Sequence, residues 1–177
     1  MKTIKLIIPA VVIVFCMVVM LCVSAGISGV RIRNERLERN ATMQALLPGS
    51  ENFVEVVYQD AVIRAVWQGE TGHVIETVVD AYVGPMTLLV GVDADGRVTG
   101  VTIRDLIETR GLGREAARNP DFLAQFLGTT GDAEVGVNVD ALTGATVTSR
   151  AVARGVNAAA GYVSGTDVSS GATEWGG

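Results

Sequence analysis

Residues 140–149 read Asp-Ala-Leu-Thr-Gly-Ala-Thr-Val-Thr-Ser, and the alanine-rich run that follows them, Arg150 to Ala160, favours an α-helix. Thr148 or Ser149 is suited to cap this helix, because a hydroxyl at the cap accepts a hydrogen bond from the first helical N–H groups. We therefore expect Thr146 just before a helix N-terminus. Unpaired N–H groups and the positive end of the helix dipole favour a phosphate at such a position.

The residues directly before Thr146 are small. Gly144 and Ala145 would leave the Thr146 hydroxyl with little steric cover, so that a phosphate or a modifying enzyme could approach it. An ordinary turn followed by a capped helix explains the same residues without any ligand, because Ser, Thr, Gly and Asp are common in turns and caps. Local chemistry alone favours this plainer interpretation.

The seven residues from Asp140 to Thr146 fit the pattern Asp-x-x-Ser/Thr-Gly-Ala-Thr. This pattern resembles the flavinylation motif of the FMN-binding domains in Rnf-type complexes and in Na+-translocating NADH:quinone reductases. In that family a flavin transferase attaches FMN through its phosphate to the last threonine. The resemblance implies that Thr146 carries FMN as a covalent phosphoester. It also assigns to the cofactor site the neighbours Thr143, Gly144, Ala145 and Thr148.

A second copy of the pattern, Asp167 to Thr173, lies close to the end of the sequence. It stands in a Gly/Ser-rich segment, and no helix-forming run follows it. We therefore expect attachment at Thr146 and keep Thr173 as a second candidate acceptor.

The N-terminal region is strongly apolar. No charged residue stands between Lys5 and Arg31. The segment from Leu6 to Ala25 has about the 20 residues that a helix needs to cross a bilayer. We expect an uncleaved transmembrane helix. The rival interpretation is a cleaved signal peptide ending at Ala25, but the apolar core exceeds the 7–15 residues or so that are typical of one.

The distribution of charge and the family resemblance predict opposite orientations for this anchor. Basic residues are more numerous after the apolar segment than before it (Arg31, Arg33, Arg36 and Arg39 against Lys2 and Lys5). This distribution weakly favours a cytoplasmic C-terminal domain. The family resemblance implies instead a single-pass protein of the inner (cell) membrane with its soluble domain on the periplasmic side, and we adopt that orientation.

After the anchor, the sequence indicates an α+β fold. Valine-rich and aromatic segments alternate with short polar breaks, which predicts a largely antiparallel sheet of five or six strands. The predicted strands are residues 53–58, 61–67, 74–83, 87–92 and 97–107, and Asp93 to Gly96 is a hairpin signal. Flanking helices follow at 120–127, capped by Asn119, and at 150–160. We expect an anchor over 1–29, a juxtamembrane helix and linker over 30–50, the FMN-binding domain over 51–165 and a flexible tail over 166–177.

The stretch Glu108 to Gly113 reads Glu-Thr-Arg-Gly-Leu-Gly. It is similar to a Glu-Thr-x-Gly-Leu-Gly segment that helps to form the flavin site in the same family, although Arg110 stands where proline is usual. The resemblance assigns to the cofactor site Glu108, Thr109, Gly111, Leu112, Gly113 and, in a second family-like segment at 82–86, Tyr82. A dinucleotide-binding fingerprint also fits Gly111 to Ala116, but Asn119-Pro120 interrupts the long helix that it requires.

Asp140 follows a predicted short strand, Val137 to Val139. Its carboxylate would bind a magnesium ion or the transferase during modification, or would simply cap the loop. The sequence leaves these alternatives open.

The rest of the composition restricts the chemistry. His73 is the only histidine, so no metal site and no catalytic acid or base is expected, and an organic cofactor must carry any redox reaction. The net charge of −5 argues against nucleic acid as a partner.

The chain most resembles the G subunit of Rnf-type ferredoxin:NAD+ oxidoreductases. This implies an electron-transfer subunit of an ion-translocating enzyme, with other membrane and redox subunits and the flavin transferase as partners. The alternatives are a membrane-anchored, non-enzymatic sensor or assembly module and a stand-alone periplasmic flavin reductase.

Overall fold

The computed structural model describes residues 16–20, 37–58, 60–106 and 119–165. The chain divides into two compact units, residues 1–41 and 42–177, and the second contains every described strand. Helical residues are found at 16–20 and 37–46. Among the described residues, no helix is long and apolar enough to span a membrane. Only residues 16–20 of the predicted anchor are described, so the anchor stays a prediction.

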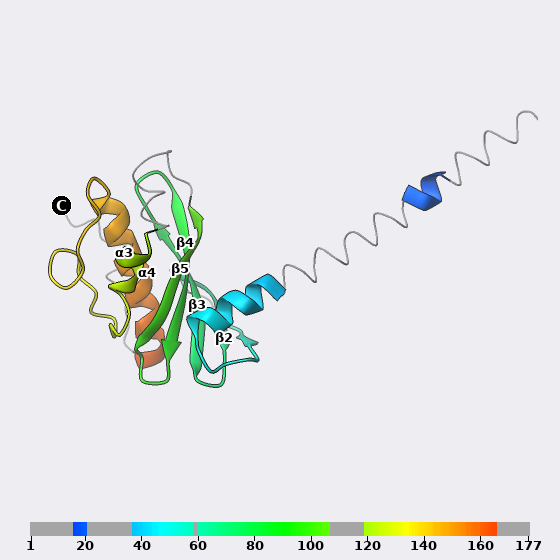
Figure 1. The fold of residues 1–177 in the computed structure, drawn as a ribbon, viewed down its shortest axis with the longest axis horizontal. Coiled ribbons are helices and arrows are strands. Elements are labelled where there is room, and N and C mark those ends of the chain that lie inside the picture. The colour runs from blue at the N-terminus through cyan, green and yellow to red at the C-terminus, as the bar shows by residue number, and fades with distance from the viewer. Residues whose placement is uncertain (1–15, 21–36, 59, 107–118, 166–177) are drawn as a thin grey trace, which may run out of the picture. The chain divides into compact units, whose positions relative to one another are not determined.

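A five-stranded antiparallel sheet forms the centre of the second unit (Figure 1). The strands pair in the order of the chain, each with its sequence neighbour, and are β1 (Val54–Val56), β2 (Ile63–Gln68), β3 (Gly72–Asp80), β4 (Pro85–Asp93) and β5 (Val98–Leu106). The Asp93 to Gly96 hairpin is confirmed, because Gly96 has a φ of 80° and Asp93 Oδ1 accepts hydrogen bonds from Asp95 N and Arg97 N. The predicted antiparallel α+β fold is therefore confirmed.

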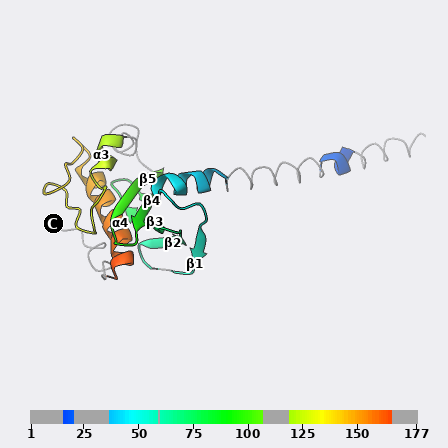
Figure 2. The ribbon, with the colours of Figure 1, turned by 60° about the horizontal axis from the view of Figure 1, so that its bottom comes forward.

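Two helices, α3 (Pro120–Ala124) and α4 (Thr146–Ser164), lie on one side of the sheet (Figure 2). The apolar side chains of α4, such as Val152 and Val156, are buried in the same core as Ile75, Leu88 and Val90 of the sheet. Asn119 caps α3 as predicted, since its side chain accepts hydrogen bonds from Asp121 N and Phe122 N. The helix is shorter than the predicted 120–127, because the hydrogen bonds of residues 125–127 reach back only three residues and Gly128 adopts a φ of 80°.

The opposite face of the sheet is covered in part by residues 43–47. Met43, Leu46 and Leu47 form a second apolar cluster with the sheet residues Trp67, Val74 and Leu89. The Thr99 hydroxyl donates a 2.6 Å hydrogen bond to the Leu46 carbonyl. The sheet is thus packed between two layers.

At the C-terminal end of α4, three aromatic side chains meet. The ring of Tyr162 lies edge-on to Tyr58, with centroids 4.7 Å apart, and to His73, with centroids 5.8 Å apart. Burial lowers the pKa of His73 below its ordinary value of 6.5.

This environment of His73 predicts a pH dependence of stability. Because the unfolded chain binds the proton more tightly than the folded one, stability rises with pH through the window just below 6.5 and is level above it. We expect His73→Gln to flatten the dependence of Tm on pH in that window, measured by thermal unfolding between about pH 5 and pH 8. An unchanged slope in the variant would assign the effect to the carboxylates instead.

Candidate functional site

The helix that follows the Gly-Ala-Thr sequence begins earlier than predicted. Thr146 is the first residue of α4, and the N-cap is Ala145, which makes no side-chain capping bond. Thr148 and Ser149 were predicted to cap a helix starting at residue 150, and this prediction is wrong. Both are buried inside the first turns of α4.

The reason for the early start is the turn before the helix. The Ala145 N–H donates a 2.9 Å hydrogen bond to the Leu142 carbonyl, and Gly144 supplies the positive φ of 76° that the turn requires. The buried Ser149 hydroxyl then joins turn and helix: it donates to the Ala145 carbonyl at 3.0 Å and accepts from the Leu142 N–H at 3.1 Å. Ser149 therefore braces the turn from inside the helix.

Thr146 is exposed at the positive end of a long helix. The first N–H groups of an α-helix have no acceptor within the helix, so they and the helix dipole favour an anion beside them. Thr143 and Gly144 are also exposed, whereas Ala145 is buried. An accessible hydroxyl at a helix N-terminus fits the phosphate end of a nucleotide such as FMN.

The β3–β4 hairpin lies at the same end of the domain. Ala81 N–H donates to the Gly84 carbonyl at 3.0 Å and closes the turn, and the Tyr82 side chain on it is 74% exposed. The other end of the sheet holds the β4–β5 hairpin, where Gly96 approaches Ser164 at the C-terminus of α4. The N-terminus of α4 therefore lies at the same end of the domain as the β3–β4 hairpin (Figure 1).

The structure does not describe the remaining predicted site residues, which are Glu108, Thr109, Gly111, Leu112, Gly113 and Thr173. In the sequence, Leu106 and Asn119 flank the residues 107–118 that the structure does not describe, and Leu106 pairs with Met86 beside the Tyr82 hairpin.

Two arginines on α4 belong to this end of the domain and were missed by the sequence analysis. Arg154 Nη2 donates a 2.8 Å hydrogen bond to the Asp80 carbonyl, at the start of the Tyr82 hairpin. Its Nε is buried and has no hydrogen-bond partner among the described residues. Arg150 is exposed and lies one helical turn closer to Thr146. The spacing of four residues from Thr146 to Arg150 to Arg154 was the signal that could have revealed them.

Asp140 does not cap its loop. Its backbone N–H donates to Gln125 Oε1 at 2.7 Å, while its exposed carboxylate makes no hydrogen bond within the described part of the chain. The predicted strand Val137 to Val139 is also wrong. The segment is a turn, because Gly136 adopts a φ of 92° and the Asn138 side chain bonds the Glu134 N–H and the Asp132 carbonyl.

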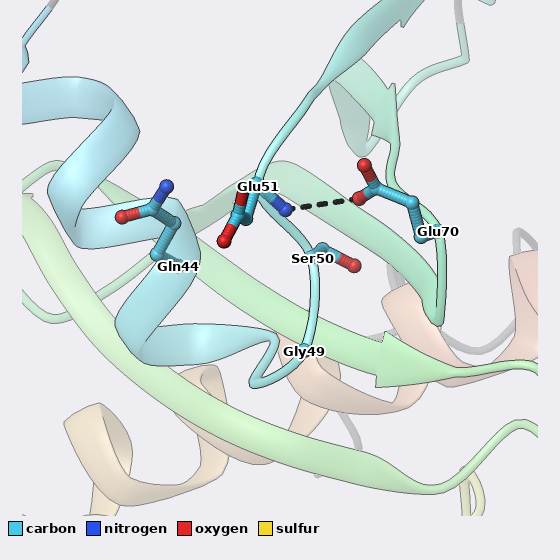
Figure 3. Close-up of a pocket in the computed structure, with 5 residues that line it drawn as sticks. All are labelled: Gln44, Gly49, Ser50, Glu51 and Glu70. Atoms are coloured by element: carbon cyan, nitrogen blue, oxygen red, sulfur yellow. Dashed lines mark hydrogen bonds between the residues drawn. The ribbon is translucent and has the colours of Figure 1, made fainter.

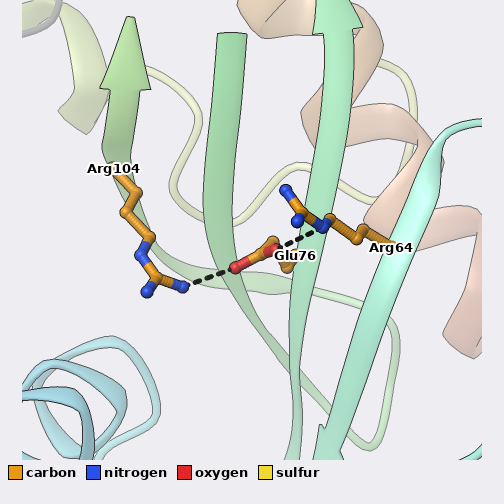
Figure 4. A network of polar contacts seen from close by, with 3 residues as sticks. All are labelled: Arg64, Glu76 and Arg104. Atoms are coloured by element: carbon orange, nitrogen blue, oxygen red, sulfur yellow. Dashed lines mark hydrogen bonds and ion pairs between the residues drawn. The ribbon is translucent and has the colours of Figure 1, made fainter. Parts of the chain in front are cut away.

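A buried carboxylate lies on the sheet face opposite α4 (Figure 4). Glu76 of β3 is 2.8 Å from Arg104 Nη1 and 3.6 Å from Arg64 Nε. Both arginines are the extra residues of register shifts, Arg64 in β2 and Arg104 in β5. Such bulges re-aim a side chain, and here each guanidinium is turned toward Glu76. The cluster compensates a buried charge within the sheet.

We expect Arg104→Ala to destabilise the domain by about 1–2 kcal/mol, because it removes the shorter bond to a buried carboxylate. Arg64→Ala serves as the matched variant and should cost less, since the contact of Arg64 is longer and its side chain is 68% exposed. Urea denaturation of both variants measures the difference. Equal losses of stability in the two variants would show that Arg64 and Arg104 stabilise the Glu76 carboxylate equally.

A pocket of about 370 Å³ is lined by Gln44, Gly49, Ser50, Glu51 and Glu70 (Figure 3). The Glu70 carboxylate accepts hydrogen bonds from Asn52 Nδ2 at 2.9 Å and from Glu51 N at 3.0 Å, and these bonds lower the pKa of Glu70, that from the Asn52 side chain most. The pocket adjoins the β2–β3 turn, at the end of the sheet away from the Tyr82 hairpin. Its acidic lining disfavours a phosphate.

The comparisons with known proteins point to the same part of the chain. A family model described as an FMN-binding domain matches residues 81–161, which include the Tyr82 hairpin and Thr146. The chain is 34% identical over 129 residues to the G subunit of the proton-translocating ferredoxin:NAD(+) oxidoreductase complex of Clostridium ljungdahlii, covering 68% of this chain and 69% of the relative.

Two further relatives match a shorter region. The G subunit of the Na(+)-translocating ferredoxin:NAD(+) oxidoreductase complex of Acetobacterium woodii is 37% identical over 95 residues, which are 49% of this chain and 46% of the relative. The G subunit of the ion-translocating oxidoreductase complex of Pseudomonas aeruginosa is 43% identical over 93 residues, which are 47% and 44%. The matched region thus spans about two thirds of the first relative and less than half of the other two.

Proposed function

Because the chain belongs to the family of FMN-binding G subunits of ion-translocating ferredoxin:NAD+ oxidoreductase complexes, we propose that it is the electron-transfer subunit of such a complex and carries FMN esterified to Thr146. The observation that carries the proposal is the exposed hydroxyl of Thr146 at the N-terminus of α4, within the matched FMN-binding region. Bound FMN accepts and donates electrons. The protein supplies its position and its electrostatic surroundings.

Attachment to Thr146 is a phosphoryl transfer. A bond forms between Thr146 Oγ1 and the phosphorus of FMN, and a pyrophosphate P–O bond in an activated flavin dinucleotide breaks. A nucleoside monophosphate leaves, and the hydroxyl proton passes to a base on a separate flavin transferase. The exposure of Thr146 supports this scheme, because a second enzyme must reach the hydroxyl. The exposed carboxylate of Asp140, six residues earlier, is available for a magnesium ion or for the transferase.

The location of the domain is part of the same proposal. The apolar segment from Leu6 to Ala25 supports a single-pass anchor over residues 1–29, followed by a linker over 30–50. The FMN-binding domain, 51–165, then lies on the periplasmic side of the cell membrane beside the other redox subunits. A covalent bond suits that location, because it keeps the flavin at high effective concentration near its partners.

Intact-mass spectrometry of the full chain, produced together with a flavin transferase, tests the proposal. The expected result is an added mass of one FMN less one water, located on the peptide that contains Thr146. Co-purification with membrane redox subunits should accompany it. An unmodified, colourless chain would favour the non-enzymatic anchored module. A flavin found on the peptide of Thr173 would move the attachment site there.

A further inference from the structure

The solvent-facing surface of α4 is narrow and basic. Most of the helix is buried, and the residues at its N-terminal end that reach solvent are Thr146, Val147, Arg150 and Arg154. Thr146, Arg150 and Arg154 follow one another at intervals of four residues, so each is rotated by only about 40° from the one before. They form a single row along the helix, which we call the arginine row.

Arg150 is the arginine of this row that lies next to Thr146. Side chains four residues apart on a helix are neighbours, with Cβ atoms about 6 Å apart, and helical side chains lean toward the N-terminus. The Arg150 guanidinium is therefore within reach of a group attached to the Thr146 hydroxyl. Arg150 is exposed, and within the described residues it makes no hydrogen bond or ion pair. Its N–H donors are therefore available to a bound phosphate.

Arg154 connects α4 to the sheet. It is half-buried, and its bond to the Asp80 carbonyl joins α4 to the β3–β4 hairpin. Arg154 lies about 12 Å along the helix from Thr146, beyond the reach of a phosphate there. It fixes the hairpin with the exposed Tyr82 beside the row, so that a flavin extending from Thr146 along the row would meet that hairpin.

The protein as a whole is acidic, with a net charge of −5. Asp140, in the loop that leads to α4, carries an exposed carboxylate. A phosphodiester on Thr146 adds one further negative charge. The helix N-terminus and Arg150 are the described groups placed to compensate it.

We propose that Arg150 binds the phosphate of the FMN carried by Thr146 and thereby directs the flavin along the arginine row toward Tyr82. Arg150 is a positioning residue, and this inference rests on the proposed function. A guanidinium suits the role, because it presents two parallel N–H donors to two phosphate oxygens. Lys at the same position would supply only a point charge.

The test uses the flavinylated full chain and its Arg150→Gln variant, with Arg97→Gln as the matched control. Arg97 is exposed too, but it lies in the β4–β5 hairpin at the far end of the domain. The readouts are the 31P resonance of the phosphodiester and the fluorescence anisotropy of the flavin. Wild-type protein in about 1 M salt provides a reference in which exposed charge pairs are screened.

We expect Arg150→Gln to shift the 31P resonance to the high-salt position and to lower the anisotropy, while Arg97→Gln matches the wild type. We expect FMN attachment to raise the Tm of both proteins. The increase should be about 2–4 °C smaller in Arg150→Gln than in the wild type. A lower yield of FMN attachment in Arg150→Gln, with an unchanged yield in Arg97→Gln, would support the same role, because the incoming nucleotide carries the same phosphate. Identical spectra and Tm increments for Arg150→Gln and wild type would overturn the inference. Absence of flavin from the wild type would instead reject the proposed function.

Discussion

Thr146→Val is expected to abolish covalent flavin while leaving the domain folded. Valine keeps the shape of threonine but has no oxygen to bond to phosphorus, so the loss of attachment should be complete. The side chain of Thr146 is exposed at the start of α4 and makes no capping bond, so the stability change should stay within about 0.5 kcal/mol. Fluorescence of the denatured, gel-separated chain measures the attachment, and thermal unfolding measures the stability.

Two matched variants separate the acceptor from its neighbours. Thr143→Val removes an exposed hydroxyl in the turn before α4, and Thr173→Val removes the second candidate acceptor. Both should retain a fluorescent band, because each leaves the Thr146 hydroxyl in place, and Thr173→Val, which lies outside the 140–146 motif, should match the wild-type intensity. A band that persists in Thr146→Val and disappears in Thr173→Val would place the flavin in the C-terminal motif.

Gly91→Ala is expected to cost the domain about 3 kcal/mol or more, a large part of the stability of a domain of this size. A Cβ atom at Gly91 would overlap the Leu46 carbonyl oxygen and lie 2.8 Å from Thr99 Oγ1. Relief requires that residues 43–47 move off the sheet, which breaks the 2.6 Å bond from Thr99 to Leu46 and opens the apolar cluster around Trp67. Urea denaturation of the variant measures the loss.

Gly128→Ala provides the comparison for this prediction. An added Cβ at Gly128 has no neighbour within 4 Å, but the φ of 80° disfavours alanine by about 1–2 kcal/mol. Gly91→Ala should therefore be the more destabilised of the two. A loss at Gly91 no greater than that at Gly128 would mean that residues 43–47 are not firmly packed on the sheet.

Local sequence patterns were sufficient for much of this fold. Valine-rich and aromatic segments separated by polar breaks predicted a sheet of five or six strands, of which five are described. Asp93 to Gly96 predicted the β4–β5 hairpin, and Asn119 before proline predicted the start of α3. Each of these features depends on residues within a few positions of one another. The motif ending at Thr146 likewise indicated the cofactor class, because it is a contiguous pattern. These predictions needed no knowledge of what packs against what.

Features that depend on distant residues could not be obtained in this way. Thr148 and Ser149 were predicted to cap the helix, yet α4 begins at Thr146. The buried Ser149 hydroxyl instead bonds the Ala145 carbonyl and the Leu142 N–H in the turn before the helix. The compensation of Glu76 depends on bulges in two other strands, and Arg154 finds its partner 74 residues away, at Asp80. Short-range periodicity determines which segments become strands and helices. Burial and long-range hydrogen bonds determine where a helix begins and which side chains meet, because those contacts form only when the segments pack together.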